Sequence, residues 1–328
     1  MAVNWHIAFS NVTTTEYAGV SYQHYYSSPA AMLQAQLAAK EYAERRWGVG
    51  RWIGAGLDFP SAGFATLFGM SLVMPEEDEM PYLDTSRPPL TDVADADKLQ
   101  SGDPKTTGLL ARRWEFYQYY HAQGYEVGFG GYGGAVISAA VELTGGAIFA
   151  GMLDNPDGAW RVLNKVMEAL ELLGEFDAAL RGGTYTGSGY TGDDFSGLLS
   201  PTLYREFAVP CYQRIYRENT TRFMHSELLR AAHLRIARDE LGLTDFHGAG
   251  CKNLTLAEMH EIMGEKFWTQ VTPQEMAELS PAQLDEKIKE YAGCGCHCVQ
   301  LYPGRHTPER NMDAALAACQ RECLGGPV

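Results

Sequence analysis

The stretch RFMHSELLRAAHLRIARDELGLTDFHGAGC, residues 222–251, decides the expected fold. It contains two short apolar segments, and each of them ends in residues that can bind a metal ion. His225 and Glu227 are two residues apart, as are Asp245 and His247. On a β-strand, where side chains alternate between faces, each pair would therefore point to one face of the sheet.

An amphipathic helix separates the two segments. Residues 227–242 carry apolar side chains at helical spacing and end at Gly242, a residue type that commonly stops a helix. A strand, a helix and a strand in this span form one βαβ unit, whose two strands are parallel neighbours. The C-terminal ends of these strands would gather five side chains around one point: His225, Glu227, Asp245, His247 and Cys251. In a β/α barrel, that end of the strands carries the chemistry.

Strands and helices continue to alternate on both sides of this unit. The expected elements are helices at 29–47, 112–123, 135–152, 155–180, 254–263, 281–291 and 309–323, a helix from Ser200, and strands at 125–129, before Asp193, at 266–270 and at 298–302. Such a run of βα units in 328 residues predicts an α/β protein, a (β/α)8 TIM barrel formed as a single domain over residues 1–328. Residues 1–108 would supply an irregular N-terminal elaboration and the first barrel elements.

Composition argues against several classes of partner. The 26 Lys and Arg residues against 41 Asp and Glu give a net charge of −15, which hardly provides a basic surface for nucleic acid. The first residues lack the basic and apolar regions of a signal peptide, so a cytoplasmic location is expected. Residues 133–153 are nearly long enough to span a membrane, but Glu142 at their centre and the Gly145-Gly146 pair favour a buried helix.

Seven cysteines in a cytoplasmic chain are expected to be thiols or ligands rather than disulfides. Cys294, Cys296 and Cys298 alternate, so on a strand they would share one face. They begin the expected strand, whereas the site proposed above lies at strand ends, so buried thiols are favoured over a metal site. Cys319 and Cys323 lie one helical turn apart, where packing is again the favoured interpretation.

Several segments carry a family resemblance. They are GDDFSGLLSPTLYREFAVPCYQRIY (192–216), FMHSE (223–227), Gly264 followed by VTP (271–273), and QLYPGRHTPERN (300–311). In order and spacing they resemble the uroporphyrinogen decarboxylase superfamily, over a region from about residue 135 to the last residue. The resemblance implies a β/α barrel. The superfamily includes porphyrin decarboxylases and zinc methyltransferases that exchange methyl groups with a corrinoid on a partner protein.

The residues favour the methyltransferase branch. The decarboxylases carry an Arg-rich N-terminal motif that binds substrate carboxylates, and no such motif is present in this sequence. In the thiol-directed methyltransferases, the strand similar to FMHSE ends in His-x-Cys, and a second Cys follows the strand similar to QLYPG. This chain has Glu227 at the first position and Arg305 or His306 at the second, so it departs from the family at both thiolate ligands.

Replacing thiolate by carboxylate changes the expected chemistry. A zinc ion with a carboxylate ligand is a stronger Lewis acid than one held by thiolates, and it would pull on the oxygen or nitrogen of a methylated substrate. The expected zinc ligands are Glu227, His247 and Cys251. His225 or Asp245 would be a fourth ligand or would support the ligands, in a catalytic role.

Further residues are candidates for catalysis and substrate contact. The resemblance implies a catalytic role for Asp194, which corresponds to an acidic position of the family; the alternative is that Asp193 and Asp194 are carboxylates near a helix N-terminus. The candidate substrate contacts are Tyr25, Trp52, Tyr190 and Arg305. Aromatic residues near the N-terminus could cover a methoxyaromatic substrate or could simply pack.

The expected function is that of a zinc-dependent methyltransferase of the O-demethylase type. It would move a methyl group from a small O-methyl or N-methyl donor to the cob(I)alamin of a separate corrinoid protein. The cobalamin is expected to arrive on that partner, as in the corrinoid-dependent methyltransferases that the chain resembles. The alternatives are a methylcorrinoid:thiol methyltransferase, a uroporphyrinogen decarboxylase-like decarboxylase and a non-catalytic binding subunit.

Overall fold

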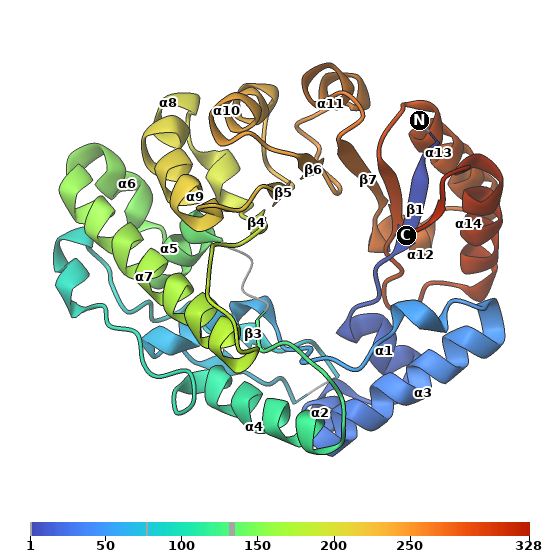
Figure 1. Ribbon diagram of the computed structural model, residues 1–328, viewed down its shortest axis with the longest axis horizontal. Coiled ribbons are helices and arrows are strands. Elements are labelled where there is room, and N and C mark those ends of the chain that lie inside the picture. Colours follow the sequence, from blue (N-terminus) through green and yellow to red (C-terminus); the bar gives the residue numbers. More distant parts are fainter. Residues whose placement is uncertain (1, 77, 131–134) are drawn as a thin grey trace. The chain divides into compact units, whose positions relative to one another are not determined.

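The computed structural model describes residues 2–76, 78–130 and 135–328 (Figure 1). The chain forms two compact units. Unit 1 contains Met1–Ala55, His225–Leu234 and Thr244–Val328, and unit 2 contains Gly56–Met224 and Arg235–Leu243. The expected single domain over residues 1–328 stays a prediction.

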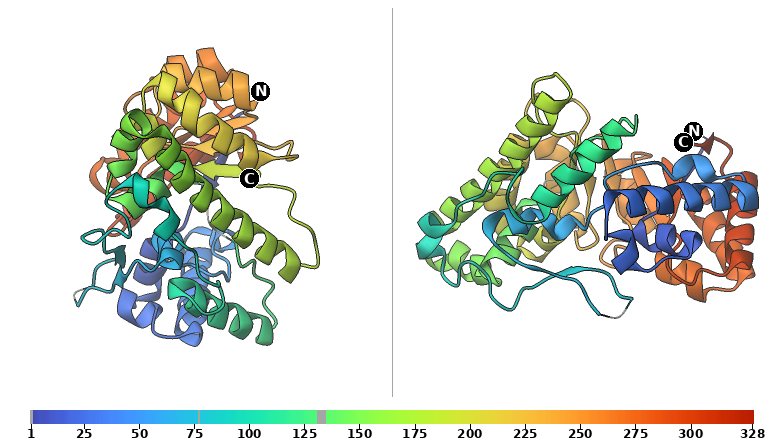
Figure 2. Two further views of the ribbon diagram at one scale, coloured as in Figure 1. Left: turned by 90° about the vertical axis from the view of Figure 1, so that its left-hand side faces the viewer. Right: turned by 90° about the horizontal axis from the view of Figure 1, so that it is seen from below.

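A parallel sheet forms the centre of unit 1. Its strand order is β6 (Asp245–His247), β7 (Phe267–Val271), β8 (Cys298–Leu301), β1 (Asn4–Ile7) and β9 (Gly326–Pro327). The end of β5 (Phe223–His225) continues the sheet at β6, where the amide of Ser226 donates to the carbonyl of His247 at 3.2 Å. The two ends of the chain lie side by side because β9 pairs with β1 (Figure 2).

The two faces of this sheet differ in polarity. Register places His247 opposite Trp268, and Gln300 opposite both Gln270 and His6, so polar and aromatic side chains share one face. The residues between them on the strands are buried and, apart from Thr269, mainly apolar; they include Ile7, Phe246, Phe267, Val271 and Leu301. The helices of unit 1 pack against that apolar face.

Capping residues set the starts of the helices that follow the strands. The helices of unit 1 are α1 (Asn11–Ala18), α2 (Tyr22–Tyr25), α3 (Pro29–Trp47), α11 (Leu256–Met263), α12 (Pro273–Glu278), α13 (Pro281–Gly293) and α14 (Glu309–Glu322), and α10 (Ala231–Leu241) runs from unit 1 into unit 2. Reciprocal capping boxes begin α11 at Thr255 and α12 at Thr272. The chain therefore leaves the strand ends in defined directions.

Unit 2 is mainly helical. Its helices are α4 (Gly108–Ala122), α5 (Val136–Thr144), α6 (Ala147–Asp154), α7 (Pro156–Leu180), α8 (Pro201–Leu203), a π-helical turn over Tyr204–Ala208, and α9 (Val209–Tyr216). The hairpin of β2 (Leu72–Val73) and β3 (Tyr82–Leu83) is antiparallel. Beside the start of β5 lies β4 (Tyr190–Gly192), where the amide of Phe223 donates to the carbonyl of Gly189 at 2.9 Å.

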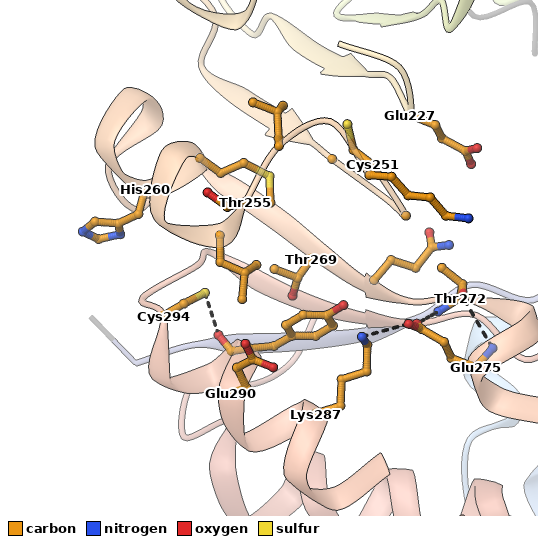
Figure 3. Close-up of a pocket in the computed structure, with 18 of the residues that line it drawn as sticks. Glu227, Cys251, Thr255, His260, Thr269, Thr272, Glu275, Lys287, Glu290 and Cys294 are labelled. Carbon is orange, nitrogen blue, oxygen red and sulfur yellow. Dashed lines mark hydrogen bonds and ion pairs between the residues drawn. The ribbon is translucent and has the colours of Figure 1, made fainter. Parts of the chain in front are cut away.

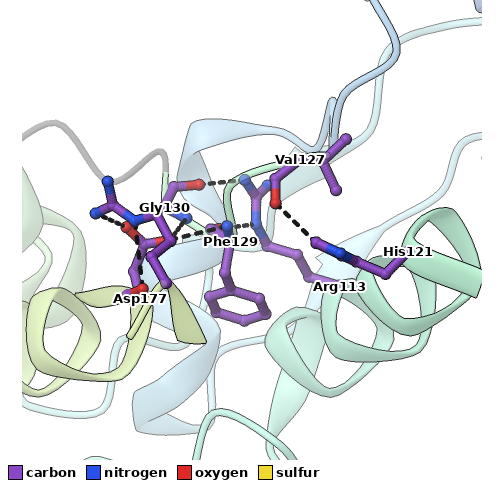
Figure 4. Close-up of polar contacts among 7 residues, drawn as sticks. Arg113, His121, Val127, Phe129, Gly130 and Asp177 are labelled. Atoms are coloured by element: carbon purple, nitrogen blue, oxygen red, sulfur yellow. Dashed lines mark hydrogen bonds and ion pairs between the residues drawn. The ribbon is translucent and has the colours of Figure 1, made fainter. Parts of the chain in front are cut away.

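The expected strand at 125–129 is wrong. This segment is a loop, and charged side chains satisfy its backbone in place of a neighbouring strand (Figure 4). Arg113 donates to the carbonyl oxygens of Phe129, at 2.6 Å, and of Gly130, while Asp177 Oδ1 accepts from the amides of both residues at 2.9 Å. Side chains can replace a ladder partner in this way, and an apolar alternation alone does not reveal them.

Two other predicted elements differ from the structure, and one strand was not predicted. The expected helix at 135–152 is two helices, α5 and α6, because Gly145 and Gly146 have φ of 59° and 90°, outside the helical range. The helix expected over 227–242 begins later, at Ala231. Strand β1 was not expected, although Val3, Trp5 and Ile7 alternate as buried residues.

The α/β class is confirmed by the alternation of parallel strands and helices. Closure of the sheet into an eight-stranded barrel stays a prediction. Across the part of the chain that the structure describes, no single helix is long and apolar enough to cross a membrane; α5 and α6 reach that length and composition only together, as a pair bent by 103°. Residues 133 and 134 of the segment first considered for a membrane span lie outside the described residues.

Candidate functional site

Two imidazoles meet at the ends of β5 and β6. Each strand is three residues long and ends in a histidine, so parallel pairing brings the rings of His225 and His247 to the same edge. Their Nδ1 atoms lie 2.9 Å apart, and the ring centroids lie 5.0 Å apart. At this distance one ring donates the hydrogen and the other accepts it, so the two tautomers are coupled.

His247 is held in its neutral form. Burial, followed by the neighbouring His225, lowers the pKa of His247 to about 3, although Gln300 acts in the opposite direction. A cation in this position would have to be formed without water around it, which is the physical reason for the lowered pKa. At neutral pH the ring therefore has a nitrogen lone pair, as a metal ligand or a proton acceptor requires.

An aromatic strip continues from His247 along the polar face of the sheet. The Trp268 ring lies 6.2 Å from the rings of both His247 and His6, in edge-on geometry. His297 stacks on Trp268 with the ring centroids 5.9 Å apart and an interplanar angle of 11°. These flat side chains form one wall beside the imidazole pair.

A pocket with a volume of about 1380 Å³ opens next to the loops that follow β5 and β6 (Figure 3). Glu227 and Cys251, from these two loops, lie on one side of it, and Cys294 and Glu290 of the α13 region lie on the other. The wall between them combines apolar and aromatic side chains with polar ones: Leu254, Met259, Thr269, Gln270, Lys287, Tyr291 and Tyr302. Such a mixture suits a small organic molecule with a polar group.

Hydrogen bonds hold the two loops together. Cys251 Sγ donates to the carbonyl of Leu229 at 3.3 Å, and Asn253 Nδ2 donates to the carbonyl of Leu228 at 2.9 Å. The turn that precedes Cys251 needs Gly250, whose φ is +61°. The loop after β6 is thus fixed to the loop that carries Glu227.

The donor atoms suit zinc in kind, because imidazole, carboxylate and thiolate are its usual protein ligands. Two nitrogens bound to a tetrahedral zinc ion at 2.0–2.1 Å lie roughly 3.3 Å apart, close to the separation of the two Nδ1 atoms. Among residues 2–76, 78–130 and 135–328, no three His, Cys, Asp or Glu side chains are gathered closely enough to hold a metal ion. The spacing of the histidine pair is close to that of two zinc ligands, but Glu227 and Cys251 face the neighbouring pocket and do not complete a set of three donors with them.

Asp245 lies at the other end of its strand from His247. Because β6 has three residues, Asp245 begins the strand and His247 ends it. The Asp245 carboxylate lies 3.6 Å from Nδ1 of His297, which precedes β8. The structure thus brings His225 and His247 together and places Asp245 with a different histidine, although the sequence grouped all three.

Two candidate residues belong to unit 2. Asp194 follows Asp193, which is fully buried and accepts hydrogen bonds from the amides of Ile137 and Ser138 at the start of α5 and from the hydroxyls of Ser138 and Tyr212. The helix-terminus alternative thus describes Asp193, where burial raises the pKa to about 6. Tyr190 stacks on Phe223 with the ring centroids 5.7 Å apart, and its side chain stays 40% exposed.

The remaining candidates belong to unit 1. Tyr25 is fully buried, and its hydroxyl accepts from Gln36 Nε2 at 3.0 Å, which favours packing over substrate contact. The indole of Trp52 donates to the carbonyl of Val328 at 3.1 Å and stacks under Arg51. Arg305 lies over the ring of Tyr22, with 5.3 Å between the guanidinium carbon and the ring centroid.

Several residues of the polar face did not figure in the expected site. Trp268 and Gln270 lie on β7, Gln300 lies on β8 and His6 lies on β1. The register of the strands places these residues beside the imidazoles. Because β1 was not predicted from the sequence, its register with β8 could not be inferred. A period-two search that included Val3, Trp5 and Ile7 would have found that strand.

Among known proteins, the similarity found for this chain is to solved structures. No protein-family model matches the chain, and no curated protein matches it. A solved structure of a methyltransferase from Methanosarcina mazei is similar over 97% of this chain and 94% of that chain, with a TM-score of 0.69 and 15% sequence identity. The chain therefore shares the fold of that methyltransferase.

Proposed function

We propose that this protein is a zinc-dependent methyltransferase. It takes the methyl group from a small O-methyl donor, for example a methoxyaromatic compound, or from an N-methyl donor, and transfers it to the cob(I)alamin of a separate corrinoid protein. The observation that carries the proposal is the contact between His225 and neutral His247 at the strand ends, beside a pocket that presents Glu227 and Cys251. The similarity in fold to a methyltransferase supports the reaction class.

Four side chains offer the donor atoms for zinc. Glu227, His247 and Cys251 are the proposed ligands, and His225 is the fourth ligand or orients His247 through their contact. Bound zinc would act as a Lewis acid toward the oxygen or nitrogen that loses the methyl group. The carboxylate of Glu227 in place of a thiolate would leave a bound ion more electron-poor, which would favour demethylation over delivery of a thiolate.

The pocket supplies the binding surface for the methyl donor. Its volume of about 1380 Å³ exceeds that of most small-molecule sites, so a small donor leaves room for the approach of a second reactant. Tyr291, Tyr302 and Met259 offer apolar contacts to an aromatic or aliphatic body. The corrinoid of the partner would supply the acceptor for the methyl group, and the oxygen or nitrogen that loses the methyl group would then take a proton.

A methyl-transfer assay tests the proposal. Purified full-length protein is loaded with zinc and mixed with free cob(I)alamin and a set of methoxylated aromatic compounds and methylamines, and the absorbance change from cob(I)alamin to methylcob(III)alamin is followed. We expect turnover with at least one donor in wild type and its loss in Glu227→Ala. Methylation of a thiol by methylcob(III)alamin without any donor demethylation would favour the thiol methyltransferase. Inactivity in both directions, with zinc bound, would overturn the proposal.

A further inference from the structure

A pair of cysteines lies between α13 and β8, in the turn Cys294-Gly295-Cys296. Cys294 ends α13, and Gly295 has a φ of +74°, so the chain doubles back between the two cysteines. Both Sγ atoms then point to the same acceptor: they lie 3.0 Å and 3.4 Å from the carbonyl oxygen of Tyr291. The turn therefore holds two thiols close to each other.

The two thiols differ in access. Cys294 is half-buried and lines the pocket of about 1380 Å³, where Figure 3 shows its sulfur on the α13 side. Cys296 is 3% exposed, and its Sγ lies 3.7 Å from the hydroxyl of Thr269 on β7. A reagent that enters the pocket can reach Cys294, while Cys296 is buried and does not line the pocket.

The two thiols also differ in acidity. A hydrogen bond from Cys296 is the largest cause that lowers the pKa of Cys294, and the same contact, together with burial, raises the pKa of Cys296. The accessible sulfur is thus the one that ionises first. This is the order that thiol exchange requires, because the thiolate is the nucleophile.

We propose that Cys294 and Cys296 form a redox-active dithiol that exchanges with a small disulfide entering the pocket. The Cys294 thiolate attacks one sulfur of that disulfide, which breaks the S–S bond and releases one small thiolate. The Cys296 thiolate then attacks Cys294 Sγ, forming the Cys294–Cys296 bond and releasing the second small thiolate. The protein loses two electrons, which the small disulfide gains, and the protons of both cysteines end on the small thiols.

A second thiol pair in unit 1 provides a matched control. Cys319 and Cys323 also share a hydrogen bond, but Cys319 on α14 is fully buried and Cys323, the residue after α14, is 2% exposed. Neither of them lines the pocket. The proposal therefore predicts reaction at the first pair and none at the second.

Thiol exchange with glutathione disulfide tests the assignment. Reduced full-length protein is incubated in glutathione and glutathione disulfide mixtures of increasing ratio, quenched by alkylation, and analysed by intact and peptide mass spectrometry. We expect wild type to lose two hydrogens, with the new bond between Cys294 and Cys296, and Cys319→Ser/Cys323→Ser to behave like wild type. Cys296→Ser should instead accumulate one glutathione on Cys294, because the second attack is impossible.

A glycine variant keeps both thiols while disturbing their turn. In Gly295→Ala, alanine would have to adopt a φ of +74°, which is strained for a residue with a Cβ atom. The new methyl group would also lie 3.4 Å from the ring of His260. The turn should therefore open. We expect at least a tenfold lower fraction of intramolecular disulfide at the same glutathione ratio, with glutathione retained on Cys294. Urea unfolding of each variant establishes that it is folded.

Three results would overturn the proposal. They are a wild type whose Cys294 stays reduced at every ratio, a stable glutathione adduct on Cys294 in wild type, and a disulfide from Cys294 to Cys251 in place of Cys296. These experiments measure thiol chemistry and need no methyl transfer. The dithiol proposal can therefore fail while the proposed methyltransferase activity stands, and the methyltransferase proposal can fail while the dithiol proposal stands.

Discussion

The Nδ1 atoms of His225 and His247 face each other across the ends of β5 and β6 at 2.9 Å. His247 is neutral and lies in a site with little water, so its ring is oriented by this contact together with the hydrogen bond to Gln300. His225→Ala should lower the free energy of unfolding by about 1–3 kcal/mol, the usual cost of losing a buried hydrogen bond. Urea unfolding measures this difference.

The matched control for that variant is His297→Ala. His297 also stacks on the aromatic strip, but its side chain is 45% exposed, so its loss should cost less than about 1 kcal/mol. Equal losses in the two variants would mean that the imidazole contact contributes no more than surface packing.

Changing Asp193 to Asn and changing Asp194 to Asn should have clearly different effects on the free energy of unfolding. Asp193 accepts hydrogen bonds from two amides and two hydroxyls around the start of α5, and the amide group of Asn cannot accept all of them. Asp193→Asn should cost about 2–4 kcal/mol of unfolding free energy. Asp194→Asn should leave stability within about 0.5 kcal/mol and, if Asp194 is catalytic, should lower kcat. A large stability loss in Asp194→Asn would assign that residue to the fold instead.

Glu142 makes the stability of the protein depend on pH. Burial, together with the nearby Asp193, raises the pKa of Glu142 from 4.5 to about 7. The unfolded chain ionises this group above pH 4.5 at no cost, so its contribution to stability is complete below pH 4.5 and is lost as the pH rises through about 7.

Glu142→Gln should therefore be more stable than wild type above pH 7, by about 1–2 kcal/mol once partial exposure is taken into account, and nearly equal below pH 4.5. Thermal unfolding at a series of pH values measures the difference. Glu175→Gln, on the exposed side of α7, is the control, and its difference from wild type should not vary in this way. A constant offset for Glu142→Gln would contradict the raised pKa.

Arg113 anchors the loop that was expected to be a strand. Its guanidinium donates to the carbonyls of Leu57 and Phe129 and to that of Gly130, an arrangement that the single ammonium of Lys cannot reproduce. Arg113→Lys should speed hydrogen exchange at the amides of Phe129 and Gly130 by at least tenfold. Arg112→Lys, one residue away on α4, should leave those amides unchanged; similar rates in both variants would contradict the anchoring role.

The C-terminal half of the fold could be predicted because its signals are local. Helix α7 begins after Asn155 with Pro156 at its first position, and α11 and α13 begin with capping boxes that are visible in the sequence. Helix α12 also begins with a capping box but was not expected. Strands β7 and β8 lie within one residue of their predicted bounds. Local signals of this kind do not depend on tertiary context.

The errors arise where long-range contacts decide the structure. Residues 125–129 have the alternation of a strand, but Arg113 and Asp177 bind their backbone instead. The contact of His225 with His247 follows from the βαβ unit and could be predicted. The placement of Asp245 beside His297 could not, because it depends on β6 being only three residues long and on the register of β8.

Zinc analysis of the purified full-length protein tests the central claim most directly. After reconstitution and removal of excess metal, wild type and the control His297→Ala should each retain about one zinc ion per chain, and Glu227→Ala and His247→Ala should retain almost none. Absence of zinc from reconstituted wild type, or full occupancy in both ligand variants, would contradict the proposed zinc site.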